Sequence, residues 1–319
     1  MPIVHSEFTP AWWLPGHHLP TLWPSLFRHR PDIPLKRERV ELADGDFLDL
    51  SWYGDTGKPI VMLLHGLEGN LHSHYARPLL KLLGESGYLA CMMHFRGCSG
   101  EPNRLPRSYH SGDSAELQTI VKHIQSTRQQ PVFGIIGFSL GANVLLKWLG
   151  EQGTQAAVER AMAVSVPFLL NEAADRLDRG FSRFYQAHLL KSMKQKYREK
   201  FSRIPSPLNV DLDQIGNFRE FDEKITAPLH GFSGADDYYQ RSSCRQFIPG
   251  IRRSTLILHD RHDPFMWPQT APSEGELPDD VLLELTSGGG HAGFVGGKTP
   301  VSTSYWTGKR LIHWLQGTS

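Results

Sequence analysis

A serine flanked by two glycines lies where one apolar run ends and another begins. It is Ser139, in a Gly-x-Ser-x-Gly sequence at residues 137–141. The preceding run, 131–136, is β-branched, aromatic and bounded by proline, which is typical of a buried strand. In the following run, Val144 and Trp148 are spaced as on the buried side of a helix. A strand that turns at once into a helix strains the middle residue and leaves room only for small neighbours. This context predicts that the Ser139 hydroxyl stands clear of the sheet, where it could act as a nucleophile.

Such a serine needs a base to take its proton and an acid to orient that base. His291 follows the apolar run Val281–Leu285 on a glycine-flanked loop, where the backbone can bend the imidazole over the serine. Asp263 follows the run Thr255–His259, and we expect its carboxylate to reach His291 Nδ1. Asp260 is the alternative acid, but it lies so close to the strand end that we expect it to cap the turn.

Two backbone N–H groups are candidates for binding an oxyanion. The N–H of Leu140 follows the serine at the start of a helix. A second donor should come from the loop after the first long parallel strand, where the N–H of Leu67 is suitably placed. The neighbouring His65 is then expected to brace this loop by hydrogen bonding, and not to act as a second base.

Together these groups predict a serine hydrolase that cleaves carboxylic esters through an acyl-enzyme intermediate. Two alternatives stay open. An alcohol could replace water and make the protein an acyltransferase, or the fold could serve as a non-catalytic binding protein. The complete set of Ser139, Asp263 and His291 argues against the second alternative. Haloalkane and epoxide hydrolysis would need an aspartate at position 139 and are excluded.

The elements that must position these residues alternate between apolar runs and helical stretches. This rhythm predicts an α/β fold, a mostly parallel doubly wound sheet with its site at the carboxyl ends of the strands. The predicted parallel strands are Ile60–Leu64, Tyr88–Phe95, the run before Ser139, Ala161–Val166, Thr255–His259 and Val281–Leu285. Before them, Asp44-Gly45 joins the runs Lys36–Leu42 and Phe47–Tyr53 in a predicted hairpin.

The strand rhythm lapses at about residues 168–250, a stretch rich in Arg and Lys. We interpret it as a helical lid or cap inserted into a single domain that spans residues 1–319. The opening segment, through Pro34, is rich in proline and aromatic residues. It is expected to pack as an arm on the body of the chain, in preference to forming a membrane or partner helix.

Composition limits the partners. The 34 Lys and Arg nearly balance the 33 Asp and Glu, which gives no electrostatic case for nucleic acid or for an anionic membrane. Three cysteines without a Cys-x-x-Cys pair, and no apparent signal peptide or membrane span, predict a cytoplasmic protein without a thiolate metal site.

A glycine-rich stretch at 292–299 resembles a phosphate-binding loop, but Pro300 disfavours the helix that such a loop must start. This stretch is therefore not expected to bind a nucleoside triphosphate.

Several blocks closely resemble the YheT-type esterases of AB hydrolase family 4, and the likeness covers nearly the whole chain. The blocks that carry it lie at residues 65–69, 94–103, 109–113, 137–143, 218–222, 237–239, 263–265 and 289–294. The resemblance implies an α/β-hydrolase fold, with Ser139, Asp263 and His291 as charge-relay residues. It also implies a small-molecule carboxylic ester substrate of the acyl or lipid type, and no cofactor. One departure is Ala142, where the family usually has glycine.

Overall fold

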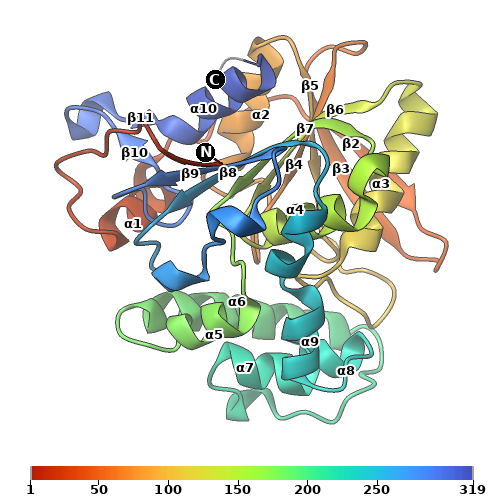
Figure 1. Ribbon diagram of the computed structural model, residues 1–319. Coiled ribbons are helices and arrows are strands. Elements are labelled where there is room, and N and C mark those ends of the chain that lie inside the picture. Colours follow the sequence, from red (N-terminus) through yellow and green to blue (C-terminus); the bar gives the residue numbers. More distant parts are fainter. Residues whose placement is uncertain (1, 318–319) are drawn as a thin grey trace.

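The structure is a computed structural model that describes residues 2–317, and its centre is a sheet of nine strands (Figure 1). The strand order is β1-β9-β8-β7-β6-β4-β5-β3-β2. The strands are β1 (Ile3–His5), β2 (Lys36–Glu41), β3 (Phe47–Tyr53), β4 (Ile60–Leu64), β5 (Leu89–Met93), β6 (Val132–Phe138), β7 (Val158–Val164), β8 (Ser254–Asp260) and β9 (Val281–Thr286). A separate short ribbon pairs β10 (Val295–Gly296) with β11 (Ser304–Tyr305).

The predicted mostly parallel sheet is confirmed. Strands β5, β4, β6, β7, β8 and β9 are parallel to their neighbours in that series, while β2 and β3 form the predicted antiparallel hairpin against β5. One strand was not predicted. β1 joins the far edge in parallel with β9, pairing Ile3 with Leu283, so the opening segment contributes to the sheet itself.

Helices cover both faces of the sheet, as a doubly wound fold requires. The ten α-helices of the described chain are α1 (His18–Phe27), α2 (Ala76–Glu85), α3 (Ser114–Arg128), α4 (Leu140–Gln152), α5 (Leu170–Leu177), α6 (Ser182–Phe201), α7 (Phe218–Phe221), α8 (Ala227–Leu229), α9 (Ala235–Ser242) and α10 (Trp306–Leu315). Along β4, alternate residues enter two apolar clusters. Met62 packs in the cluster of α3 and α4, while Val61 and Leu63 pack in the cluster of α2 and α10. Burial of both sides explains why the strand is apolar throughout.

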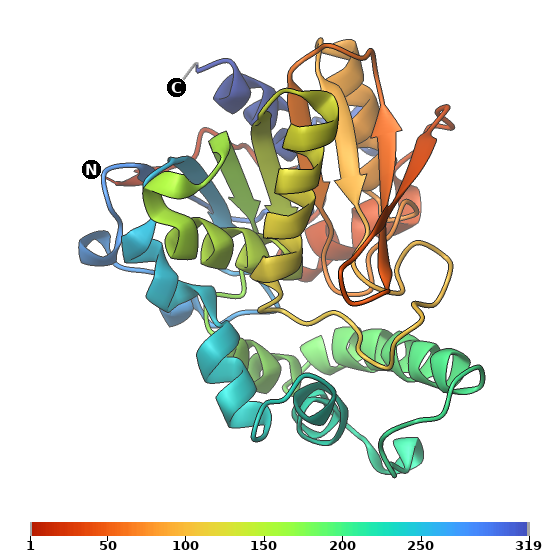
Figure 2. The same cartoon turned by 90° about the vertical axis from the view of Figure 1, so that its right-hand side faces the viewer.

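Between β7 and β8 the described chain contains helices and no strand. Helices α5–α9 form a layer beneath the carboxyl ends of the parallel strands (Figures 1 and 2). We call this layer, residues 168–250, the cap. It has its own apolar cluster, which includes Leu177, Tyr185, Phe218 and Phe221. This is the stretch in which the sequence predicted a helical insertion, while its role as a lid stays a prediction.

Candidate active site

Ser139 lies at the junction of β6 and α4, in a strained conformation with φ 50° and ψ −116°. The glycines on either side are required by close backbone contacts. A Cβ at Gly137 would lie 2.5 Å from the carbonyl oxygen of Gly141, and one at Gly141 would lie 2.5 Å from that of His65. Leu140 is the first residue of α4, where helix N–H groups lack intrahelical acceptors. The sharp strand-to-helix turn predicted from the sequence is therefore present.

His291 and Asp263 form a buried pair. His291 Nδ1 lies 2.9 Å from Asp263 Oδ2 and 3.1 Å from Oδ1. The Phe265 N–H donates to the same carboxylate at 2.8 Å, and the Phe265 ring stacks on the imidazole with centroids 3.8 Å apart. Burial acts to raise the pKa of Asp263, but His291 and these hydrogen bonds keep it below its usual value. The contact fixes the imidazole and leaves its Nε2 available for proton transfer.

Asp260 has a different set of partners. Its Oδ1 accepts from the His262 N–H at 2.9 Å. Its Oδ2 accepts from the Thr286 hydroxyl at 2.8 Å and from the Gly289 N–H. It thus ties the turn after β8 to the loop after β9, as expected for a residue that braces the turn. Of the two acids, Asp263 is the one that contacts His291.

Ser139 and the residue that follows His291 are each hydrogen-bonded to the end of β7. No hydrogen bond joins the side chains of Ser139 and His291 within residues 2–317. The Ser139 N–H donates to the carbonyl of Val164 at 2.9 Å. The next residue, Ser165, accepts the Ala292 N–H on its hydroxyl, also at 2.9 Å. Both candidate residues therefore flank the end of β7, and hydrogen bonds between catalytic groups commonly tighten only when substrate binds.

His65 braces the loop after β4. Its Nδ1–H donates to the carbonyl of Gly66 at 2.7 Å, and its Nε2 accepts the Phe95 N–H at 3.1 Å. Burial lowers its pKa to about 3, so the ring is neutral and both nitrogens are engaged. The predicted bracing hydrogen bonds of His65 are present, while the prediction that it is not a second base stays a prediction. The loop it supports lies against the serine, because a Cβ at Gly66 would be 3.3 Å from Ser139 Cβ.

Among the described residues, the backbone N–H of Leu67 has no hydrogen-bond acceptor, whereas the N–H groups on either side of it do. The Gly66 N–H donates to the Tyr75 hydroxyl at 2.9 Å, and the Glu68 N–H donates to the Tyr109 hydroxyl at 2.8 Å. The Leu67 N–H between them has no acceptor among the described residues, and Leu67 lines the same cavity as Ser139. An amide in this position is available to an oxyanion.

Glu68 anchors this loop from its other side. It has a left-handed backbone, φ 59°, which is uncommon for a residue with a side chain. Its carboxylate accepts from the Tyr109 hydroxyl at 2.9 Å and from the Ser192 hydroxyl, and it lies 3.2 Å from Lys196 Nζ. Ser192 and Lys196 belong to α6. The cap therefore contacts directly the residue that follows the candidate oxyanion donor.

A cavity of about 310 Å³ lies between the sheet and the cap, with Ser139 in its wall. Its walls are mostly apolar. The apolar residues that line it include Leu67, Leu140, Leu170, Ala173, Ala174, Leu177, Leu189, Met193, Phe218, Phe221, Ile225, Leu229, Phe265 and Met266. Several charged residues also line it, among them Glu68, Arg96, Lys196, Lys200 and Asp222. Burial raises the pKa of Asp222 to about 6, although Thr226 and Tyr239 donate hydrogen bonds to it.

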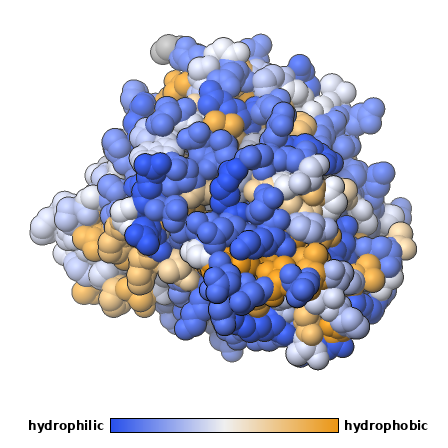
Figure 3. Space-filling view, turned by 90° about the horizontal axis from the view of Figure 1, so that it is seen from below, coloured by the Kyte–Doolittle hydropathy of each residue, from blue (hydrophilic) through white to orange (hydrophobic). Residues whose placement is uncertain are grey.

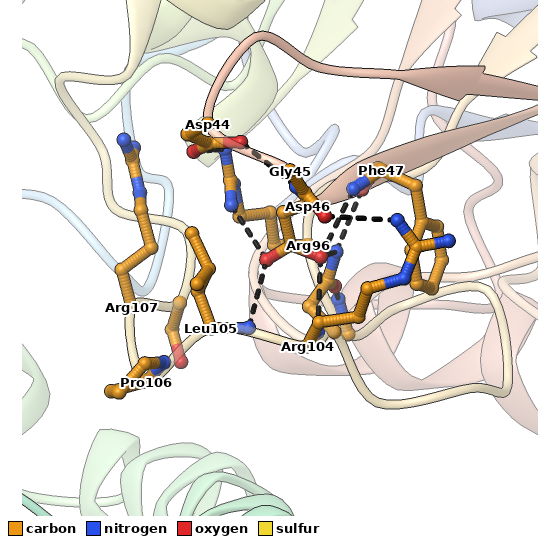
Figure 4. Close-up of polar contacts among 12 residues, drawn as sticks. Asp44, Gly45, Asp46, Phe47, Arg96, Arg104, Leu105, Pro106 and Arg107 are labelled. Atoms are coloured by element: carbon orange, nitrogen blue, oxygen red, sulfur yellow. Dashed lines mark hydrogen bonds and ion pairs between the residues drawn. The ribbon is translucent and has the colours of Figure 1, made fainter.

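The loop of residues 96–111 forms one side of this cavity and is anchored by Asp46 (Figure 4). Asp46 accepts from Arg96 Nη1 at 2.7 Å and from the N–H groups of Arg104 and Leu105, at 3.0 and 3.2 Å. Lys200 on α6 then donates to the carbonyl oxygens of residues 105, 106 and 107. The loop is therefore held between the hairpin on one side and the cap on the other.

Helix α1 supports the histidine loop, a role that sequence reasoning missed. The His291 N–H donates to the Thr21 hydroxyl at 2.9 Å. A Cβ at Gly290 would lie 2.6 Å from that hydroxyl oxygen, and one at Gly293 would lie 2.0 Å from the carbonyl oxygen of Pro20. The glycines around His291 were interpreted as a means of bending the loop. They also indicate close backbone approach, which could have pointed to this helix.

Residues 2–317 contain no group of three or more His, Cys, Asp or Glu side chains that could hold a metal ion. None of their helices is long and apolar enough to cross a membrane.

A serine on a strained strand–helix turn, above a parallel sheet and beside a His–Asp pair, is the arrangement of an α/β hydrolase. Comparison with known proteins agrees. The family model described as "alpha/beta hydrolase fold" matches residues 59–298. The chain belongs to the alpha/beta hydrolase family.

Among its relatives, the chain is 39% identical to "Putative esterase YheT" of Escherichia coli (strain K12), over 97% of this chain and 93% of that protein. This match confirms the resemblance found in the sequence. It is 27% identical to mouse "Phospholipase ABHD3", over 95% of this chain and 77% of that protein. Among solved structures, the Pyrococcus furiosus esterase Pf2001 has the same fold, with a TM-score of 0.58 and 17% identity over 89% of this chain and 92% of that one.

Proposed function

We propose that this hydrolase is a serine esterase that cleaves carboxylic esters through an acyl-enzyme intermediate. One observation carries the proposal. The buried His291–Asp263 pair and the strained Ser139 both lie at the carboxyl end of the sheet. The names of relatives support the substrate class, because they include an esterase, a phospholipase and a yeast monoacylglycerol lipase.

In this mechanism, Ser139 attacks the acyl carbon while His291 Nε2 takes its proton. Asp263 keeps the Nδ1 proton in place and stabilises the imidazolium that forms. The N–H groups of Leu67 and Leu140 bind the oxyanion of the tetrahedral intermediate. His291 then protonates the leaving alcohol, and water repeats the sequence to release the acid.

The apolar cavity favours esters with an acyl chain of some length. Its volume of about 310 Å³ is within the range of small-molecule sites. The acyl chain of the substrate would lie between Leu140 and the cap residues Leu177, Met193 and Phe221. The cap would then act as a lid within one domain, so that acyl transfer takes place away from bulk water. The acyltransferase alternative stays a prediction, and product analysis in mixed alcohol and water separates it from hydrolysis.

A cytoplasmic location is part of the same proposal. Cys91, Cys98 and Cys244 are all buried and unpaired, which suits a reducing compartment.

Replacement of the nucleophile tests the proposal. The substitution Ser139→Ala should reduce hydrolysis of p-nitrophenyl esters by about 10⁴-fold or more, because no other hydroxyl can form the acyl-enzyme. Ser99→Ala is a matched control, since Ser99 lies in a Gly-Cys-Ser-Gly loop with no helix directly after it. A Ser139→Ala enzyme with unchanged kcat, and with a circular dichroism spectrum like the wild type, would end the assignment.

A further inference from the structure

Helix α1 has its apolar face turned to solvent. Its buried residues are Pro20, Thr21 and Pro24, on the side that holds the histidine loop. Leu19 and Leu26 point away from these residues, and Phe27 ends the helix with its ring centroid 4.2 Å from that of Trp23; the three side chains are between 45% and 70% exposed. A surface helix normally buries its apolar stripe against the core, and α1 instead leaves these three apolar side chains in solvent.

Helix α6 extends the apolar surface. Phe181, directly before α6, and Phe184 in its first turn are 52% and 58% exposed. The two helices touch, because the His18 ring lies 4.6 Å from that of Phe181 and His18 Nδ1 lies 3.1 Å from the Tyr185 hydroxyl. We name this surface the α1–α6 face, and it consists of Leu19, Leu26, Phe27, Phe181 and Phe184.

This face gathers most of the exposed apolar side chains of the described chain. It holds five of its seven large exposed hydrophobic residues, and the others are Trp12 and Val301. Seen from the cap side, apolar surface interrupts the polar surface on the left, the side on which Figure 1 places α1 (Figure 3). Apolar side chains clustered in this way, and not scattered singly, mark an interaction surface.

The segments that carry the face are basic, although the whole chain has a formal net charge of only +1. Residues 8–31 contain two Arg and no Asp or Glu. Residues 179–198 contain six Lys or Arg, of which Arg179, Lys196 and Arg198 pair with Asp175, Glu68 and Asp213. Arg30, Arg183 and Lys191 are exposed and form no ion pair with the described residues, so they are the charges that a partner can reach. A partner that complements this face should offer negative charge at its surface and an apolar layer below it. An anionic phospholipid bilayer has both.

The face lies beside the candidate active site. Thr21, on the inner side of α1, accepts the His291 N–H. Leu22, at the edge of the face, packs against the apolar cluster of the cap, which Leu67 and Phe265 also contact.

We propose that the α1–α6 face docks on the surface of an anionic phospholipid bilayer. Helix α1, of 10 residues and about 15 Å, lies in the plane of the interface with Leu19, Leu26 and Phe27 among the acyl chains. The exposed Arg183 and Lys191 of α6 contact the lipid headgroups. The inference adds a surface to the proposed esterase but does not depend on its chemistry.

Co-sedimentation of the full chain with sucrose-loaded vesicles tests this docking. Two vesicle types are compared, phosphatidylcholine alone and phosphatidylcholine with one third phosphatidylglycerol. The wild type should bind the anionic vesicles, and Leu26→Ser with Phe184→Ser should weaken this binding about tenfold or more. Arg183→Gln with Lys191→Gln should weaken binding to anionic vesicles about tenfold and have little effect on neutral ones.

Controls separate docking from folding and from catalysis. Lys122→Gln, an exposed lysine on α3, should bind vesicles like the wild type. Ser139→Ala should also bind like the wild type, so the result stands whether or not the esterase proposal does. Each variant should retain the wild-type circular dichroism spectrum. Wild-type protein that does not bind anionic vesicles would overturn the proposal, as would a wild-type dimer that becomes a monomer in the Leu26→Ser, Phe184→Ser variant. The second result would assign the face to a second copy of the chain.

Discussion

At the scale of single residues, local bonding assigns the two late aspartates to different tasks. Asp260 is the last residue of β8, Asp263 lies in the turn that follows, and both are buried. Asp260 uses its oxygens on Thr286 and two N–H groups, whereas Asp263 faces the His291 ring. Position after the strand therefore does not decide the role of each acid. The direction in which the turn points the carboxylate decides it.

This difference can be tested with two matched substitutions. Asp263→Asn keeps the shape but can donate a hydrogen bond to His291 Nδ1, which favours the tautomer that cannot take the serine proton. Its kcat on p-nitrophenyl esters should fall roughly 10³–10⁴-fold with little loss of stability. Asp260→Asn should instead lower the free energy of unfolding by about 1–3 kcal/mol and change kcat by less than about tenfold. The reverse pattern, measured by steady-state kinetics and urea unfolding, would assign the catalytic acid to Asp260.

Much of the site could be predicted at this scale, because its residues carry local signals. Ser139 is marked by flanking glycines, and His291 by a glycine loop after a strand. The loop amide of Leu67 follows from its place after β4. What could not be predicted is the support from distant segments, such as the contact of Thr21 with the His291 N–H. A hydrogen bond between residues 270 positions apart leaves no local pattern.

At the scale of elements, the loop of residues 96–111 depends on buried charges. Arg96 and Asp46 have side chains that are 2% and 0% exposed, and Asp46 also binds the backbone of residues 104 and 105. Asp44 and Glu116 share the same guanidinium. The sequence predicted the hairpin at Asp44-Gly45, but the pairing of its turn with Arg96 is a tertiary feature that hydrophobic periodicity does not report.

Removal of one charge from the buried Arg96–Asp46 pair should lower the free energy of unfolding. Asp46→Asn should lower the free energy of unfolding by about 2–3 kcal/mol, because Arg96 stays buried with fewer acceptors. Asp32→Asn is the matched control, since Asp32 is almost fully exposed in its pair with Arg77 and should matter by about 0.5 kcal/mol or less. Urea denaturation followed by circular dichroism measures both. Equal effects of the two substitutions would show that the buried group does not stabilise the loop.

At the scale of the whole molecule, several buried groups have pKa values that link stability to pH. Burial lowers the pKa of His65 to about 3, and those of His94 and His259 to about 4. A histidine with a depressed pKa in the folded state binds its proton more readily when unfolded. Its stabilising contribution is therefore present above about pH 6.5 and is lost as the pH falls. Glu116 acts in the opposite direction, because burial raises its pKa to about 7.

These histidines outnumber the opposing carboxyl groups, Glu116 and Asp222, whose pKa values burial raises to about 7 and about 6. Each histidine should cost about 2 kcal/mol of stability between pH 7 and pH 5, and the two carboxyl groups together should return about 3 kcal/mol. The free energy of unfolding should therefore fall by a few kcal/mol over this range, as measured by urea denaturation at each pH. A protein that is as stable at pH 5 as at pH 7 would show that these histidines are not buried in the neutral form.

The fold could be predicted at this scale because β-α alternation is repeated along the chain. The cap was predicted as an interruption of that rhythm, between β7 and β8. Two features escaped prediction. The edge strand β1 (Ile3–His5) is too short for a periodic signal, and the apolar side of α1 gives the same pattern whether it faces the core or solvent.

The central claim is that Ser139 is a nucleophile activated by His291. Labelling with a fluorophosphonate, followed by intact-mass and peptide analysis, measures it most directly. The wild type should gain one adduct per chain, located on Ser139. Ser139→Ala should gain none, and His291→Gln should react at least about 100-fold more slowly, because the serine would lose its general base. Labelling of a different residue, or an unchanged labelling rate in His291→Gln, would contradict the account.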